Sequence, residues 1–331
     1  MKMENSTYVY EKYVTTKEGV RDTLNEYGVA IIPNVLNEEE CEEMRNGMWE
    51  YLEHITSDFE IPINRNNEES WRSLRLLYPK HSMLIQEWNI GHTQLSWNLR
   101  QNPKIYEIFA HIWNVAARDL LVSFDGCSFH FPPEITKFGW YRGNQWLHCD
   151  QSYLRNDFEC VQSWINGYDT NEGDATLTFF EGSNKHHREF RERFNITDRE
   201  DWYKLENSDQ HDFYVNEKGC KQYHIKCPKG SLVLWDSRTI HCGSEPMKGR
   251  EIPNMRCVVY LCYAPRNLIT TRDLNKKIKA FEEMRTTNHW PCKPKLFPKI
   301  PRTYGGPIPP VKKIEAPILN EIGRRLIGYE V

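Results

Sequence analysis

Short apolar runs rich in β-branched and aromatic residues follow one another closely between residues 120 and 264 of this 331-residue chain. Turn-forming residues such as Pro132-Pro133 separate the runs, and most of them have no helical pattern in between. Because parallel sheets need long crossover connections, this density of strands predicts an antiparallel barrel or sandwich rather than a Rossmann sheet. The runs are LLVSFDGCSFHF (120–131), NQWLHCDQSY (144–153), CVQSWINGY (160–168), ATLTFFEG (175–182), GSLVLWDSRTIH (230–241) and RCVVYLCYA (256–264).

Helices are predicted before this strand-rich region. A short apolar strand in EYGVAIIPNVL ends at Pro33, and Asn37 is a suitable N-cap for a helix that starts with three glutamates. Apolar residues then recur at helical spacing as far as Ile55, which predicts a helix over 38–55. A weaker pattern predicts a second helical region over roughly 93–119. The expected fold is therefore mainly β with flanking helices, in the α+β class.

The chain divides into three parts by composition. Residues 1–26 are predicted to be a lead-in, residues 27–266 to form one domain, and residues 267–331 to form a basic, Pro-rich extension that packs on or extends from the core. Within the extension, Thr271 and Asp273 can cap a helix that runs to about Met284, and a short amphipathic helix lies in ILNEIGRRLIGY (318–329). The extension holds 13 Lys/Arg and 6 Asp/Glu, a local charge of +7.

A charged insertion over residues 186–222 interrupts the strands. Two interpretations of this insertion stay open: a solvated helix and loop, or a lid over a site. Loops of this length are often functional, but not always. The net charge of −3 argues against nucleic acid as a partner, and the oligomeric state stays open.

Ten cysteines occur without a C-x-x-C pair, which argues against a structural zinc module. The first residues lack the pattern of a signal peptide, and no apolar run approaches the roughly 20 residues that a membrane helix needs. These observations predict a soluble, cytoplasmic protein in a reducing compartment, with no membrane partner.

The pair His148 and Asp150 is the first candidate metal site. Residues i and i+2 of a strand face the same side, so their side chains point together, with Trp146 and Ser152 on the same face. A buried carboxylate is costly unless it is paired or bound to a metal. Since His-x-acid triplets also arise by chance, and His187-Arg188-Glu189 is another, the pair alone is weak support.

Two further residues follow in GSLVLWDSRTIHCGSEP and MRCVVYLCYAP. His241 stands at the end of an apolar strand, where a histidine can be a ligand or simply a hydrogen-bonded rim residue. Arg256 opens another apolar strand, and a guanidinium fixed there needs a bidentate anion, from the protein or from a ligand.

The order of these motifs resembles the phytanoyl-CoA dioxygenase family of Fe(II)- and 2-oxoglutarate-dependent oxygenases. The resemblance covers roughly residues 27–265 and includes GVAIIPNVLNEEECEEMR, KGSLVLWDSRTIHCGS and WINGYDTNEGDATLTFFEGSNKHH, in which Glu181 stands where proline is usual. It implies a double-stranded β-helix, which is a cupin-like jelly roll with helices packed outside. It also implies Fe(II), 2-oxoglutarate and O₂, with hydroxylation of a C–H of a small-molecule substrate and release of succinate and CO₂.

The same resemblance implies the roles of single residues. His148, Asp150 and His241 would be the metal ligands and the catalytic centre, which leaves positions on iron for co-substrate and O₂. Arg256 would bind the far carboxylate of 2-oxoglutarate, with Ser244 and Trp164 completing the co-substrate site. The presence of Asp150 disfavours the halogenase variant of this chemistry.

Departures from the family pattern leave alternatives open. The family usually has Ser two residues after the distal ligand, whereas here Cys242 and Gly243 stand between His241 and Ser244. Arg256 also lies a few residues farther along the chain from His241 than is usual, so Arg250 is a rival anchor for 2-oxoglutarate. Two other functions remain possible at this point: a cupin-like metal enzyme that needs no 2-oxoglutarate, or a non-catalytic binding protein that acts through its basic C-terminal extension.

Overall fold

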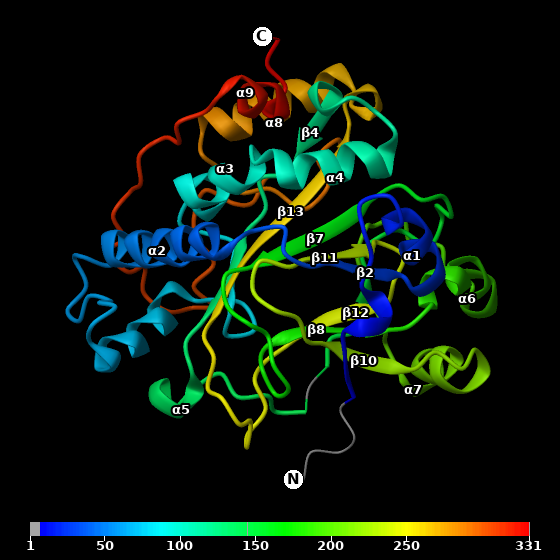
Figure 1. The fold of residues 1–331 in the computed structure, drawn as a ribbon, viewed down its shortest axis with the longest axis horizontal. Helices are drawn as coiled ribbons and strands as arrows, with labels where there is room; N and C mark the ends of the chain where they lie inside the picture. Colours follow the sequence, from blue (N-terminus) through cyan, green and yellow to red (C-terminus); the bar gives the residue numbers. More distant parts are fainter. Residues whose placement is uncertain (1–6, 144, 331) are drawn as a thin grey trace.

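The structure of this protein is a computed structural model that describes residues 7–143 and 145–330. Residues 1–6 of the predicted lead-in and Asn144, the first residue of one predicted strand, lie outside the described residues, as does Val331. Two β-sheets pack face to face, and helices cover their outer faces (Figure 1). This is a jelly-roll core with added helices, which confirms the fold predicted from the density of short strands.

The larger sheet has the strand order β2-β11-β7-β13-β5-β3, and β4 pairs with the far end of β13. Its pairings are antiparallel, and the long β13 lies between β7 and β5. The strands are β2 Val29–Ile32, β3 Leu84–Ile85, β4 Leu120–Val122, β5 Cys127–His130, β7 Val161–Asn166, β11 Leu232–Asp236 and β13 Arg256–Pro265.

The smaller sheet has the order β1-β10-β8-β12-β6-β9. Strand β1 runs parallel to β10, and the other pairings are antiparallel. His241 of β12 is the direct partner of His148 of β6, so the register of this sheet brings the two histidines together. The strands are β1 Tyr8–Val9, β6 His148–Cys149, β8 Thr176–Phe180, β9 Tyr203–Lys204, β10 Gln222–Ile225 and β12 His241–Ser244.

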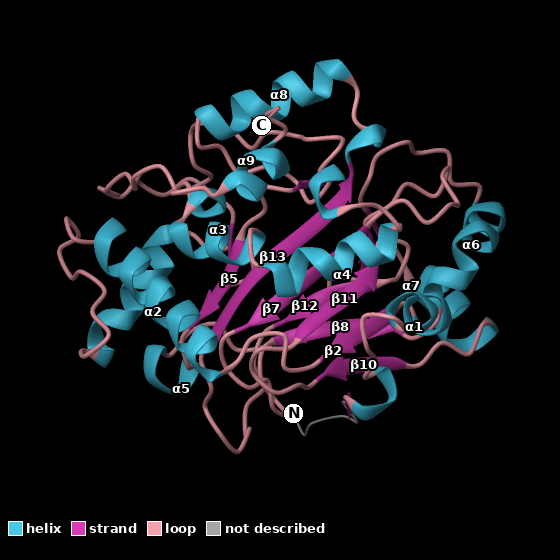
Figure 2. Cartoon of the chain, turned by 45° about the horizontal axis from the view of Figure 1, so that its top comes forward, coloured by secondary structure: helices cyan, strands magenta, loops and turns pink. Residues whose placement is uncertain are grey.

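Helices and apolar side chains form layers on both sides of this sandwich. Helices α2, α3 and α4 lie over the outer face of the larger sheet (Figure 2), and α6 and α7 pack outside the smaller one. Between the sheets, aromatic and aliphatic residues such as Trp164, Phe179 and Val233 fill the interior. The helices are α1 Val20–Tyr27, α2 Glu38–Ile55, α3 Gln94–Arg100, α4 Pro103–Trp113, α5 Pro133–Thr136, α6 His187–Phe194, α7 Ser208–Asp212, α8 Thr271–Glu282 and α9 Glu321–Ile327.

The predicted helix over 38–55 is confirmed as α2. Asn37 Oδ1 accepts a hydrogen bond from the Glu40 amide at 2.9 Å, and the Glu40 carboxylate accepts one from the Asn37 amide at 2.7 Å. This reciprocal pair is a capping box. Three acidic residues in the first turn add a favourable interaction with the helix dipole.

Other predicted helices need correction. The region 93–119 is divided into α3 and α4, because Pro103 cannot continue a helix and instead occupies the first turn of α4 behind its N-cap Asn102. The N-cap of α8 is Thr270, one residue before the predicted Thr271. Helix α1, which begins in the predicted lead-in and ends one residue beyond it, was not predicted. Among residues 7–143 and 145–330, no helix combines the length and hydrophobicity needed to cross a bilayer.

The C-terminal extension lies against the core. Helices α8 and α9 contact each other, and α9 also contacts β4. Lys277 of α8 is buried; its ammonium donates to the carbonyl oxygen of Val122 and lies 3.9 Å from the centre of the Phe124 ring. Burial lowers the pKa of Lys277 from 10.5 to about 7.

Replacing Lys277 by Met should stabilise the protein near neutral pH. In the unfolded chain the amine keeps its usual pKa of 10.5, so between pH 7 and 10.5 the unfolded state binds more protons and stability rises with pH. The free energy of unfolding of the Lys277→Met protein should lack this pH dependence. At pH 7 it should be higher than that of the wild type by about 1–4 kcal/mol. Urea unfolding at several pH values measures both effects. Lys276→Met, at an exposed position of the same helix, is the control and should change neither.

Candidate metal centre and its cavity

A cavity of about 230 Å³ lies between the two sheets. Strands β6, β7, β8, β11, β12 and β13 all contribute side chains to its wall. Segments outside these strands complete it: residues 80–86 around β3, Asp125 of the loop between β4 and β5, Trp146 and Asp150 beside β6, Asp201 and Trp202 of the charged insertion, and residues 288–297 of the C-terminal extension. The insertion is therefore more than a solvated helix and loop, because two of its residues form part of this wall.

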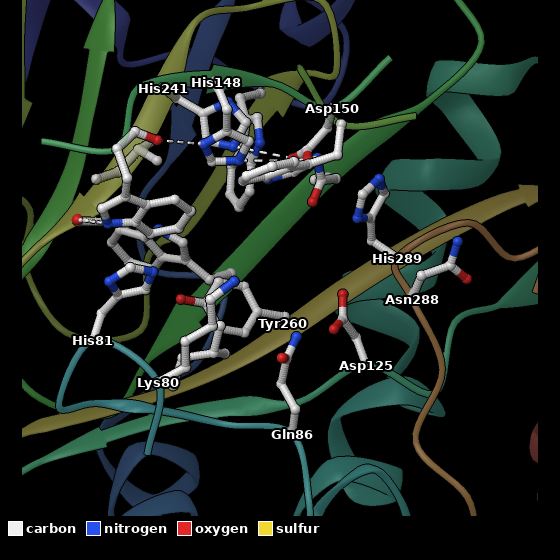
Figure 3. Close-up of a pocket in the computed structure, with 18 of the residues that line it drawn as sticks. Lys80, His81, Gln86, Asp125, His148, Asp150, His241, Tyr260, Asn288 and His289 are labelled. Carbon is white, nitrogen blue, oxygen red and sulfur yellow. Dashed lines mark hydrogen bonds and ion pairs between the residues drawn. The ribbon is translucent and has the colours of Figure 1, made fainter. Parts of the chain in front are cut away.

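His148, Asp150 and His241 converge in this cavity (Figure 3). One ligand atom of each residue lies within 4.8 Å of those of the other two, and all three residues are buried. The Nε2 atoms of His148 and His241 are 3.4 and 3.2 Å from the two carboxylate oxygens of Asp150. Two imidazoles and one carboxylate in this arrangement can hold a divalent metal on one side and leave other positions free.

Backbone carbonyls set the orientation of both imidazoles. The Nδ1 atom of His148 lies 3.0 Å from the Trp146 carbonyl oxygen, and that of His241 lies 2.9 Å from the Thr239 carbonyl oxygen. With Nδ1 donating a proton to each carbonyl, the lone pair of each Nε2 points at the shared site. Metal-binding histidines are commonly oriented by this kind of outer hydrogen bond.

Asp150 is held just after β6 by backbone hydrogen bonds and by the side-chain amide of Gln162. The amides of Asp150 and Gln151 both donate to the Ser237 carbonyl oxygen at 3.1 Å, and Gln162 Nε2 donates to Asp150 Oδ2 at 2.7 Å. Burial would raise the pKa of Asp150, but the adjacent imidazoles outweigh burial and hold that pKa well below its usual value. The carboxylate is thus ionised, as a metal ligand must be.

Aromatic rings stack on the metal-facing histidine. The rings of Trp146 and His148 are nearly parallel with centroids 4.6 Å apart, and His81 stacks on the other face of Trp146 at 4.1 Å. As predicted, Trp146 faces the same side as His148. Ser152 does not, because its hydroxyl donates to the Asp198 carbonyl oxygen of the insertion.

Arg256 and Arg250 have different surroundings. Arg256 lines the cavity; its Nε donates to Ser128 Oγ at 2.9 Å, and Nη1 donates to the Ala175 carbonyl oxygen at 2.7 Å. Within the described part of the chain, no carboxylate forms an ion pair with Arg256. Arg250 lies away from the cavity and is paired at 2.8 and 2.7 Å with the carboxylates of Glu134 and Asp174. Arg256 thus keeps capacity to bind an anion in the cavity, whereas Arg250 is already neutralised.

The two other predicted co-substrate residues lie in different places. Trp164 lines the cavity next to Arg256, whose guanidinium carbon is 5.5 Å from the indole centre. Ser244 is not brought to the cavity. Side chains alternate along β12, so Ser244 faces away from His241, and its hydroxyl contacts Thr178 Oγ at 2.6 Å.

Some residues of this site were missed in the sequence. Gln162 had a usable signal, because it is a polar residue inside an apolar strand and shares a face with Trp164. His81 and His289 had none, since each lies in an irregular segment far in sequence from the metal-binding residues.

Comparison with known proteins agrees with this geometry. A family model described as phytanoyl-CoA dioxygenase matches residues 24–250, about two thirds of the chain. The chain belongs to the phytanoyl-CoA dioxygenase family. Members of this family use Fe(II) and 2-oxoglutarate. The buried His, Asp and His side chains fit such a metal, because their donor atoms converge and the carboxylate is ionised.

Three relatives illustrate how far the likeness extends. Ava biosynthesis cluster protein O of Aspergillus versicolor is 27% identical over 281 residues, which cover 82% of this chain and 85% of that protein. A hypothetical protein of Escherichia coli has a similar fold, with a TM-score of 0.58, 13% identity, and coverage of 96% of this chain and 85% of the other. The product of GlcNAc Inducible Gene 2 of Candida albicans matches with a TM-score of 0.52 and 13% identity, over 83% of this chain and 69% of the other. The two structures support the fold alone.

Proposed function

We propose that this phytanoyl-CoA dioxygenase family member is a 2-oxoglutarate-dependent dioxygenase that hydroxylates a C–H bond of a small molecule and releases succinate and CO₂. The observation that carries the proposal is the convergence of His148, Asp150 and His241 in one buried cavity, with Arg256 on the wall of that same cavity. Bound Fe(II) would supply the activation of O₂ for this reaction.

The protein side chains have separate tasks in this proposal. His148, Asp150 and His241 hold the metal through two Nε2 atoms and one carboxylate oxygen. Arg256 binds the far carboxylate of 2-oxoglutarate, and a guanidinium suits this task because it can donate two parallel hydrogen bonds. Trp164 packs beside that guanidinium and forms part of the wall of the co-substrate site.

Aromatic side chains form much of the wall around the metal-binding histidines. Trp146, Trp202 and Trp235 lie around the two imidazoles, with ring centroids 4.6 to 5.7 Å from the nearer histidine. A dry site protects a reactive oxidant from side reactions and strengthens the polar contacts made within it. The cavity volume of about 230 Å³ supports a small-molecule substrate rather than a macromolecular one.

Anaerobic reconstitution with Fe(II) and 2-oxoglutarate tests the proposal. A weak visible charge-transfer band should appear when both are present and should be absent when either is omitted. On admission of O₂, succinate should form and should increase with a productive substrate, as measured by mass spectrometry. A protein that binds Fe(II) but gives neither the band nor succinate would point instead to a cupin-like metal enzyme that does not use 2-oxoglutarate.

The name of the Aspergillus relative, which refers to a biosynthesis cluster, supports a substrate from small-molecule biosynthesis.

The ten cysteines are all buried and unpaired, which supports the prediction of a reducing, intracellular compartment.

A further inference from the structure

The cavity contains a second polar region, formed by Gln86, Asp125 and His289. Figure 3 shows Asp125 and Gln86 apart from the His148, Asp150 and His241 group, with His289 between Asp150 and Asp125. Asp125 comes from the loop between β4 and β5, whereas His289 comes from the C-terminal extension. The extension lies beyond residue 250, where the family match ends, so this region combines a family segment with one outside the match.

Asp125 is a carboxylate without a cationic partner. Its Oδ1 accepts a hydrogen bond from the Gly126 amide at 2.8 Å. No ion pair to Asp125 is present among residues 7–143 and 145–330. Arg100 donates to the backbone oxygen of Asp125 at 3.1 Å, and not to its carboxylate. Burial raises the pKa of Asp125, and the nearby His289 and Arg100 oppose this effect without cancelling it.

The position of Asp125 is fixed by its backbone. A Cβ atom on Gly126 would lie 2.2 Å from the Ile85 carbonyl oxygen, so the loop is packed directly against β3. On the other side, the buried Arg100 guanidinium donates to the backbone oxygens of both Gly91 and Asp125. These contacts fix the backbone of Asp125, and its side chain lines the cavity.

Apart from Arg256, which is assigned to the co-substrate, the other charged side chains of the cavity wall outside the metal-binding group have compensation. Asp201 is paired with Arg155 at 2.5 Å, and Lys295 is paired with Glu200 at 2.5 Å. The Lys80 ammonium lies 5.6 and 5.9 Å from the ring centres of Trp146 and Trp202, within the range of cation–π attraction.

The surroundings of Asp125 suit an organic cation. His289 Nε2 is buried and has no hydrogen-bond partner in the described part of the chain, so it is available to a ligand. Trp290 and Phe297 of the extension add aromatic surface to the same cavity. A carboxylate combined with aromatic faces is the chemistry that recognises protonated nitrogen.

We propose that Asp125 binds a protonated nitrogen of the substrate, which is therefore an organic amine with an apolar or aromatic body. The identification of this ligand as the substrate rests on the proposed function. Because Asp125 and the metal-binding residues lie at different ends of the cavity, the oxidised carbon is separated from the nitrogen by the body of the molecule. His289, placed between the two ends, contacts that body.

Binding of three probes of similar shape and different charge tests this proposal. Phenethylamine is a cation at neutral pH, 2-phenylethanol is neutral and phenylacetate is an anion. Titration of the full chain, followed by tryptophan fluorescence and calorimetry, should give a dissociation constant for the amine that is lower than those of the other two by about tenfold or more. The Asp125→Asn protein, which keeps the shape of the side chain, should lose this preference.

Asp201→Asn is the matched control, because Asp201 lines the same cavity but its charge is already paired with Arg155. It should keep the preference for the amine.

The proposal would be overturned by any one of three results: tighter binding of phenylacetate or 2-phenylethanol than of phenethylamine, an unchanged preference in Asp125→Asn, or no binding of phenethylamine at millimolar concentration. Repeating the titrations with and without Fe(II) and 2-oxoglutarate, under anaerobic conditions, separates it from the proposed function. If the metal chemistry is absent but the preference for the amine is intact, only the proposed oxygenase function is rejected, and the amine site stands.

Discussion

Replacing Asp150 by Ala should remove tight Fe(II) binding and reduce succinate formation by at least about 100-fold. Asp150 is the only carboxylate in the described residues that lies within reach of both His148 Nε2 and His241 Nε2, at 3.4 and 3.2 Å. Loss of an outer-shell partner alone commonly lowers metal affinity 10- to 100-fold, so loss of a direct ligand should cost more. Calorimetric titration with Fe(II) under anaerobic conditions and a succinate assay measure the two effects.

A histidine outside the cavity provides the control for this experiment. His224 is buried in the smaller sheet, where its Nδ1 lies 2.8 Å from Thr178 Oγ, and it does not line the cavity. His224→Gln should keep Fe(II) affinity and succinate formation, although its stability will fall. The His148→Ala and His241→Ala proteins should behave like Asp150→Ala. Full activity in any of the three, with a folded protein by circular dichroism, would contradict the assigned ligands.

Replacing Arg256 by Met should raise the KM for 2-oxoglutarate by about 30-fold or more. Removal of one partner of a buried, hydrogen-bonded charge pair typically costs about 2–5 kcal/mol, and each 1.4 kcal/mol corresponds to a factor of ten. Fe(II) affinity without 2-oxoglutarate should stay unchanged, because Arg256 contacts Ser128 and Ala175 and not the metal-binding residues. Succinate formation at varied 2-oxoglutarate concentrations measures the change.

Arg250→Met distinguishes the two candidate anchors. Arg250 is paired with Glu134 and Asp174 away from the cavity, so its loss should lower the free energy of unfolding and leave the KM for 2-oxoglutarate within about twofold of wild type. The opposite pattern, with a large KM effect from Arg250 and none from Arg256, would reverse the assignment. No KM effect from either change would show that neither arginine anchors 2-oxoglutarate and that another group binds its far carboxylate.

Regular elements were the most predictable part of this protein. Helix α2 was predictable with its bounds because its capping box and its apolar spacing are local signals. The strands β5, β7, β8 and β11 also lie inside the predicted runs, and β13 extends one residue beyond its run. Shorter elements were harder, because β6 consists of His148 and Cys149 alone and is defined by its neighbours β12 and β9.

The residues of the candidate site could be predicted only because the order of motifs along the chain resembles that of the family. His148, Asp150, His241, Arg256 and Trp164 all line the cavity, but their roles remain predictions until the variants are measured. Ser244 illustrates the limit of reasoning from motifs. One residue more than in the family pattern separates Ser244 from His241, so Ser244 stands three positions after His241, an odd number, and faces the other side of β12.

The sequence by itself determined the strand-rich core, the helix over 38–55 and the types of residue available for a metal, because periodicity, caps and residue chemistry are local properties. Only the tertiary structure decided which side chains share one cavity. His148 and His241 meet through a strand pairing across more than 90 residues. Among the described residues Asp125 forms no ion pair, and the nearby Arg100 donates to its backbone oxygen instead. The C-terminal extension brings His289 into the same cavity. Such encounters depend on register and packing between distant segments, and no local pattern in the chain encodes them.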